Sequence, residues 1–108
     1  MIRIDVYKKN GFIFKVEMDG HSGYSDGDDI VCAAVSSVSH AILNGMEKLV
    51  NIKFGYEVGD GYLFFVLPDD LNPGQRDNAK LLTETFLLFV KNLESQYPDF
   101  VKVTELEV

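Results

Sequence analysis

Residues 2–18 read IRIDVYKKNGFIFKVEM. Apolar side chains alternate with polar ones on both sides of a central pair, Asn10-Gly11. Alternation with period two is typical of half-buried strands, and Asn-Gly suits a type I′ turn because both positions favour positive φ. The stretch therefore predicts a β-hairpin with strands over 2–8 and 12–18. The two strands are expected to turn one face each to the core, formed by Ile2, Ile4 and Val6 and by Phe12, Phe14, Val16 and Met18.

The rest of the chain predicts two helices and three further strands. In chain order they are a helix over 30–50, strands over 54–58 and 62–67, a helix over 73–96 and a strand over 100–108. Asp28 or Asp29 is expected to cap the first helix, and Pro73 suits the first position of the second. The fold class is α+β: a two-layer domain of ββαββαβ order, with a mainly antiparallel sheet and two helices. The order of strands within the sheet stays open.

The second predicted helix is apolar over more than one stripe, at Leu82, Phe86, Leu87, Leu88, Phe89 and Val90. Such a helix is either buried on several sides or lies in a subunit interface. One small domain can hardly bury all six side chains, which favours a homodimer. The alternative is that the sheet covers most of them and the rest are ordinary exposed residues.

Length and composition indicate one soluble domain over residues 1–108. Ten Lys and Arg against seventeen Asp and Glu give a net charge of −7. This balance disfavours direct nucleic-acid binding and favours basic partners. The single cysteine forbids an internal disulfide and suggests a reducing compartment. No apolar run approaches the ~20 residues of a membrane span, and no signal-peptide core is evident, so we expect a cytoplasmic protein with no membrane partner.

The unusual segment lies between the first hairpin and the first helix. Cys32 falls in the first turn of that helix, where backbone N–H groups and the helix dipole favour a thiolate. His21 precedes it by eleven residues, across a glycine-rich loop that can fold back over the helix start. An imidazole in reach of a thiol can take its proton and leave a nucleophile. A lone cysteine among apolar neighbours is more often a small buried hydrophobe, and these residues alone favour that interpretation.

The other polar residues near this segment have simpler interpretations. His40 is eight residues after Cys32, or ~12 Å along a helix, and is expected to be a helix-surface or interface residue without a catalytic role. The three aspartates of the loop do not match the spacing of a calcium loop, and the lack of nearby Lys or Arg argues against phosphate binding. Asp29 suits either a helix cap alone or a cap that also orients His21. No metal and no cofactor is expected.

At this point the residues resemble a known signature. Gly20-His21, a short loop with Gly27, and then the run from Asp29 to Ser36, DIVCAAVS, are similar to the pattern of the ribosomal-processing cysteine protease family, Prp. The predicted element order and the chain length agree with this family over the whole sequence. The resemblance implies a bacterial cysteine endopeptidase and homodimer that removes the N-terminal extension of large-subunit ribosomal protein twenty-seven during ribosome assembly.

Carried over by position, the resemblance implies that His21 is the general base and Cys32 the nucleophile of a Cys/His dyad. Gly20, Gly27, Asp29 and Ser36 match motif positions that shape the site. The N–H of Cys32 itself is the expected donor to the oxyanion. A ribosomal substrate rich in Lys and Arg suits the acidic chain. Two other classes stay open: a non-catalytic ribosome-associated binding module, and a small hydrolase or transferase acting on metabolites.

Overall fold

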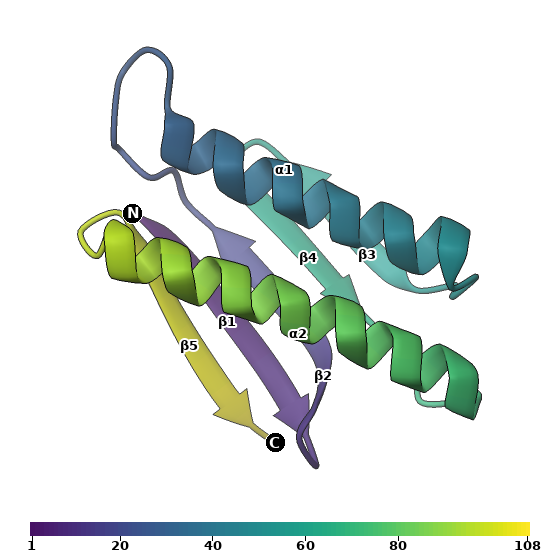
Figure 1. Ribbon diagram of the computed structural model, residues 1–108. Helices are drawn as coiled ribbons and strands as arrows, with labels where there is room; N and C mark the ends of the chain where they lie inside the picture. The colour runs from purple at the N-terminus through teal and green to yellow at the C-terminus, as the bar shows by residue number, and fades with distance from the viewer.

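The Asn10-Gly11 turn forms as its sequence requires, with both residues at positive φ (52° and 77°). It joins β1 (Ile2–Lys9) to β2 (Phe12–Asp19) in an antiparallel pair, which confirms the predicted hairpin. The computed structural model describes residues 1–108, and Figure 1 shows its two layers: one sheet with both helices lying across the same face.

The sheet has five strands in the order β3-β4-β2-β1-β5. The remaining strands are β3 (Gly55–Gly59), β4 (Tyr62–Val66) and β5 (Val101–Glu107). Three of the four pairings are antiparallel, and only β1 and β5 run parallel. The α+β, two-layer, mainly antiparallel prediction is confirmed. The order leaves β3 and β5 as the two edges of the sheet.

A β-bulge interrupts the alternation predicted for the second strand. Tyr7 pairs with Lys15, but Lys8 pairs with Ile13, so Phe14 is the extra residue of β2. Ile13 is consequently fully buried, whereas Phe14 is only half-buried. Phe14 still packs against the core but is less buried than predicted, because a bulge shifts the period-two pattern by one residue.

The two helices begin where short polar side chains can accept from free backbone N–H groups. Asp29 caps α1 (Ile30–Asn44), which continues as a single π-helical turn, η1 (Gly45–Leu49). Asn72 caps α2 (Pro73–Gln96), and Gln75 bonds back to the N–H of Asn72 to complete a capping box. The predicted starts of both helices are confirmed.

One expectation about membranes needs correction. The continuous helical segment Ile30–Leu49 is 20 residues long with a mean hydropathy of 1.2, enough by length and composition to cross a bilayer. Its apolar side chains have another use here, because Val31, Val35, Ile42 and Met46 all belong to the buried core. Core helices of globular proteins reach this hydropathy for the same reason.

The sheet and α1 cover only part of the apolar surface of α2. Phe86, Leu87 and Val90 are buried in the core. Leu88 remains 67% exposed, and Leu81, seven residues earlier on the same side of the helix, is 68% exposed. The domain thus buries half of the predicted apolar set and leaves an outer apolar face on α2.

The central strands are expected to carry most of the folding stability. Ile4 on β1 is completely buried, whereas Ile30 at the start of α1 is 52% exposed. Ile4→Ala should lower the free energy of unfolding by about 2–5 kcal/mol, through lost burial and the cavity left behind. Ile30→Ala makes the same chemical change at the surface and should cost less than about 1 kcal/mol. Urea denaturation measures both, and similar losses for the two variants would contradict the assignment of the core.

Candidate active site

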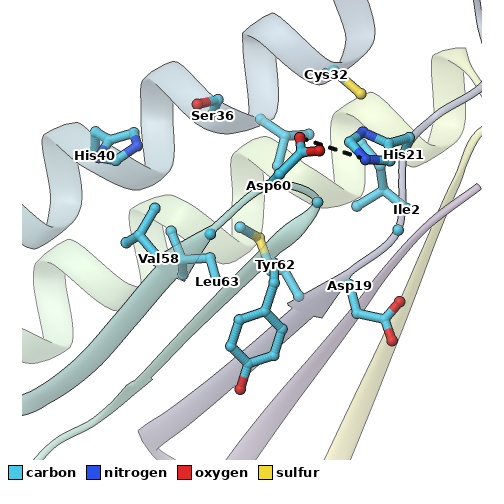
Figure 2. Close-up of a pocket in the computed structure, with 15 residues that line it drawn as sticks. Ile2, Asp19, His21, Cys32, Ser36, His40, Val58, Asp60, Tyr62 and Leu63 are labelled. Atoms are coloured by element: carbon cyan, nitrogen blue, oxygen red, sulfur yellow. Dashed lines mark ion pairs between the residues drawn. The ribbon is translucent and has the colours of Figure 1, made fainter.

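A cleft opens where the end of β2, the start of α1 and the β3–β4 hairpin meet. It encloses about 250 Å³ and contains both dyad candidates, His21 and Cys32. Its other lining residues come from β1, β2 and the residue after β2 (Ile2, Met18, Asp19, Gly20), from α1 (Val35, Ser36, His40) and from the hairpin (Val58, Gly59, Asp60, Gly61, Tyr62, Leu63). Figure 2 shows the sulfur of Cys32 directed toward the imidazole of His21 across this space.

Asp29 fixes the start of α1 and the loop in front of it. Its Oδ1 accepts from the N–H of Val31 (3.1 Å) and of Cys32 (2.9 Å). Its Oδ2 accepts from the hydroxyl of Ser22, which in turn accepts from the N–H of Tyr24 (3.1 Å). Neither oxygen bonds to His21, so the structure assigns Asp29 to capping and to holding the loop, and not to orienting the imidazole.

The carboxyl of Asp29 is held in its ionised form. Desolvation by its surroundings opposes ionisation, but hydrogen bonds from the Cys32 N–H, the Ser22 hydroxyl, the Cys32 thiol and the Val31 N–H outweigh it. The pKa of Asp29 therefore lies below its ordinary value of 3.8. The cap is therefore charged near neutral pH, and a negative charge at a helix N-terminus is favourable.

Cys32 is half-buried at the edge of the core, and its sulfur is a hydrogen-bond acceptor. The backbone N–H of Ser22 lies 3.2 Å from Sγ. Ser22 is itself 3% exposed, so this donor is shielded from water. This sulfur thus has a fixed backbone donor on one side and the cleft on the other.

The backbone N–H of Cys32, expected to donate to the oxyanion, already has a hydrogen-bond partner. It already donates to Asp29 Oδ1, and the N–H of Ala33 donates to the Asp29 carbonyl (3.0 Å). The expectation that the Cys32 N–H is a free oxyanion donor is therefore wrong for the resting structure, because the helix cap uses it. The Ser22 N–H is the donor that lies beside the sulfur.

His21 follows the end of β2. Contacts of Gly20 position its backbone, and contacts with the β3–β4 hairpin position its ring. The preceding residue, Gly20, donates to the carbonyl of Gly61 (2.8 Å), and a Cβ on Gly20 would collide with the Met1 carbonyl. The ring rests against Gly61, where a Cβ would lie 2.7 Å from Nε2. Asp60 Oδ1 lies 3.6 Å from Nε2, but it is 98% exposed and therefore a weak partner. No hydrogen bond joins the ring to Cys32 in this resting geometry.

Of the remaining motif residues, Ser36 lies in the cleft and Gly27 does not. Ser36 lies one turn after Cys32 and lines the cleft, as expected. Gly27 has open space around it except for the Ser25 side chain, and nothing in the structure requires glycine there. The loop aspartates do not converge: the structure has no group of three or more His, Cys, Asp or Glu side chains that could hold a metal ion.

Some residues of the cleft were missed or misplaced by sequence reasoning. His40 is exposed on the helix surface as predicted, and it also lines the cleft one turn beyond Ser36 (Figure 2). The spacing of Cys32, Ser36 and His40 at four-residue intervals was the available signal. Ser22 and Asp60 carry no comparable signal, because only the folded loop and hairpin bring them to Cys32 and His21.

Comparison with known proteins decides the family. The family described as cysteine protease Prp matches residues 1–102. The chain belongs to the Prp family of cysteine proteases. It is 33% identical over 95 residues to the ribosomal processing cysteine protease Prp of Bacillus subtilis (strain 168), and the match covers 85% of each chain. The resemblance seen in the Gly20-His21 and Asp29–Ser36 segments is thus confirmed.

Solved structures of Prp proteins share the whole fold. The essential ribosomal processing protease Prp from S. aureus, in complex with a covalently linked product peptide, has a TM-score of 0.87 at 27% identity; the match covers 97% of this chain and 99% of that one. The same protease in complex with a substrate peptide has a TM-score of 0.83 at 26% identity, with the same coverage. The S. aureus protease of this architecture therefore binds peptides.

The Asp29 cap can be tested against its neighbour Asp28, which is exposed and makes no hydrogen bond. Asp29→Ala should lower the free energy of unfolding by about 1 kcal/mol, the usual cost of losing an N-cap. Asp28→Ala should change it by less than about 0.5 kcal/mol. Equal effects in urea denaturation would contradict the capping role.

The same cap predicts a pH dependence. Because the pKa of Asp29 is lowered, the stabilisation by its charge is fully present above 3.8 and is lost as pH falls through the lowered pKa. Asp29→Asn keeps an acceptor but has no charge to lose. The stability difference between the wild type and Asp29→Asn should therefore narrow below pH 3.8, and a constant difference would contradict the charged cap.

Proposed function

We propose that the chain is a cysteine endopeptidase in which Cys32 and His21 form the catalytic dyad. The observation that carries this proposal is the cleft itself, in which the sulfur of Cys32 faces the His21 ring while an N–H of Ser22 donates to the same sulfur. Support also comes from membership of the Prp family and from the peptide complexes of the S. aureus protease.

The proposed reaction proceeds in two steps. His21 takes the proton of the Cys32 thiol, and the thiolate attacks the peptide carbonyl to form a tetrahedral oxyanion. As the C–N bond breaks, the imidazolium gives its proton to the leaving amine, and an acyl-enzyme thioester remains. His21 then takes a proton from water, whose oxygen attacks the thioester; the C–S bond breaks, the imidazolium returns its proton to the Cys32 sulfur, and a carboxylic acid is released.

The geometry suggests how the oxyanion is stabilised. The N–H of Cys32 is held by Asp29, so the Ser22 N–H at 3.2 Å from the sulfur is the preformed donor closest to the attacking atom. As negative charge moves from the sulfur to the carbonyl oxygen, the Ser22 N–H lies near both atoms and can donate to the oxyanion. A donor fixed by the fold needs little reorganisation during the reaction, which is what makes such groups effective.

We further propose that the substrate is the basic N-terminal extension of large-subunit ribosomal protein twenty-seven, cut during ribosome assembly in the cytoplasm. The Bacillus subtilis relative is named a ribosomal processing protease. Charge supports a basic substrate: the chain carries −7, the loop exposes Asp26 and Asp28, and Asp60 is almost fully exposed at the cleft. Complementary charge accelerates encounter at low ionic strength.

The dyad and the substrate are tested together with a peptide that spans this extension. Wild type should cut it at one bond, and Cys32→Ala and His21→Ala should each lower kcat by about 10³-fold or more, because both groups act on the same step. Mass spectrometry of the products measures the cut and its position.

The matched control is Ser37→Ala, a small change on the exposed side of α1 outside the cleft, which should leave the rate unchanged. Cleavage that survives in Cys32→Ala would contradict the dyad. Binding of the peptide by a wild type that never cuts it would support the alternative of a non-catalytic binding module.

We also propose that the chain is a homodimer, joined through the outer apolar face of α2. Leu81 and Leu88 lie two turns apart on that face and are each exposed by about two-thirds, and Phe89 is exposed by 37%. A second copy of the same face would remove this apolar surface from water, which is the main driving force of association. A helix face that meets its own copy also satisfies two-fold symmetry.

Leu88→Glu should convert the dimer to a monomer, because it buries a charge against apolar side chains. Light scattering after size exclusion measures the mass of the species, expected near 24 kDa for the wild type and near 12 kDa for the variant, from a chain mass of 12.1 kDa. Lys80→Glu reverses a charge on a neighbouring exposed position and should leave the mass near 24 kDa. A monomeric wild type would contradict the proposal.

A further inference from the structure

The edge strand beside the cleft has no partner on its outer side. β3 pairs only with β4, and all five of its residues, Gly55–Gly59, are exposed. In an antiparallel pair, alternate residues turn their N–H and C=O groups toward the partner strand, and the others turn theirs outward. The outer side of β3 therefore presents a short row of free backbone donors and acceptors, which an extended peptide can pair with.

This edge and α1 form the two sides of the same cleft. Val58 and Gly59 of β3 line it from one side, and Cys32, Ser36 and His40 line it from the other at one-turn intervals (Figure 2). The eight residues from Cys32 to His40 span ~12 Å of helix. An extended chain advances ~3.3 Å per residue, so this line matches about four residues of a strand.

The opposite edge strand of the sheet, β5, carries more charged side chains than β3. β5 carries charged side chains at Lys102, Glu105 and Glu107, the kind of edge that discourages added strands. β3 carries one charge, Glu57, between Tyr56 and Val58, and has glycine at both ends. Of the two edges, only β3 adjoins the cleft that holds Cys32.

We propose that the peptide substrate binds as an additional strand along the free edge of β3, with about four of its residues on one side of the scissile bond lying between β3 and the Cys32-Ser36-His40 face of α1. This inference rests on the proposed function, because it names the way that the same site holds its peptide. Main-chain hydrogen bonds to β3 would bind the peptide. Such pairing requires an extended, unfolded substrate segment, such as a terminal extension; a folded loop could not form it.

Backbone pairing has a signature that side-chain recognition lacks. If one residue of the peptide donates its N–H to β3, the next residue points its N–H away. Replacing each N–H of the substrate peptide in turn by N-methyl removes one donor and leaves every side chain in place. Over the four residues on the bound side, kcat/KM should fall by about tenfold or more at every second position and by less than about threefold at the positions between.

Binding to Cys32→Ala, measured by fluorescence anisotropy with the same peptides, separates this inference from the proposed function. Alternating losses of affinity would support the added strand even if wild type cut nothing. Losses that do not alternate, or that are confined to the bond being cut, would overturn it.

A photo-crosslinking side chain placed four residues from the scissile bond locates the bound segment. Labelling within residues 55–59, or at His40 and its neighbours on α1, is expected. Labelling of β5 or of the outer face of α2 would overturn the proposal. The matched control is the same peptide with the crosslinking side chain placed at its opposite end.

Discussion

The site depends on one carboxylate with two tasks. Asp29 Oδ1 accepts from the N–H groups that begin α1, and Oδ2 accepts from the Ser22 hydroxyl at the other end of the loop. The first task places Cys32 in the opening turn of the helix. The second returns the loop to that turn, so that the Ser22 N–H reaches the sulfur and His21, one residue earlier, faces it. This double contact, together with the packing of the Tyr24 ring against Tyr97 and Phe100, defines the path of a loop with three glycines between residues 20 and 27.

The sheet supplies the other half of the geometry. β2 ends at Asp19, so His21 leaves the sheet where the β3–β4 hairpin turns at Asp60 and Gly61. The bond from Gly20 to the Gly61 carbonyl ties the two together, and the absence of a side chain at Gly61 leaves room for the ring. Three segments far apart in the sequence thus define a cleft that is open along the helix, which suits a polymeric substrate better than a small metabolite.

Much of this could be predicted from local sequence, since local rules govern it. The Asn10-Gly11 turn, the Asp29 cap and the Pro73 start each follow from the conformational preference of one or two residues. What could not be predicted depends on long-range pairing: the bulge at Phe14, the parallel β1–β5 pair, and the contact between His21 and Gly61. Only the structure shows that the Cys32 N–H, the donor predicted for the oxyanion, already donates to Asp29 in the resting protein. The surface position of His40 could be predicted, but not that this surface lines the same cleft as Cys32, two turns away.

The most direct measurement is the rate of alkylation of Cys32 by iodoacetamide near neutral pH, in wild type, His21→Ala and Asp29→Ala. If the fold holds an imidazole against an activated thiol, wild type reacts fast, and both variants slow by roughly tenfold or more, one by losing the base and the other by releasing the loop. Asp28→Ala should react like wild type. Equal and slow alkylation in all four proteins would mean that Cys32 is a packing residue, and the central claim would be wrong.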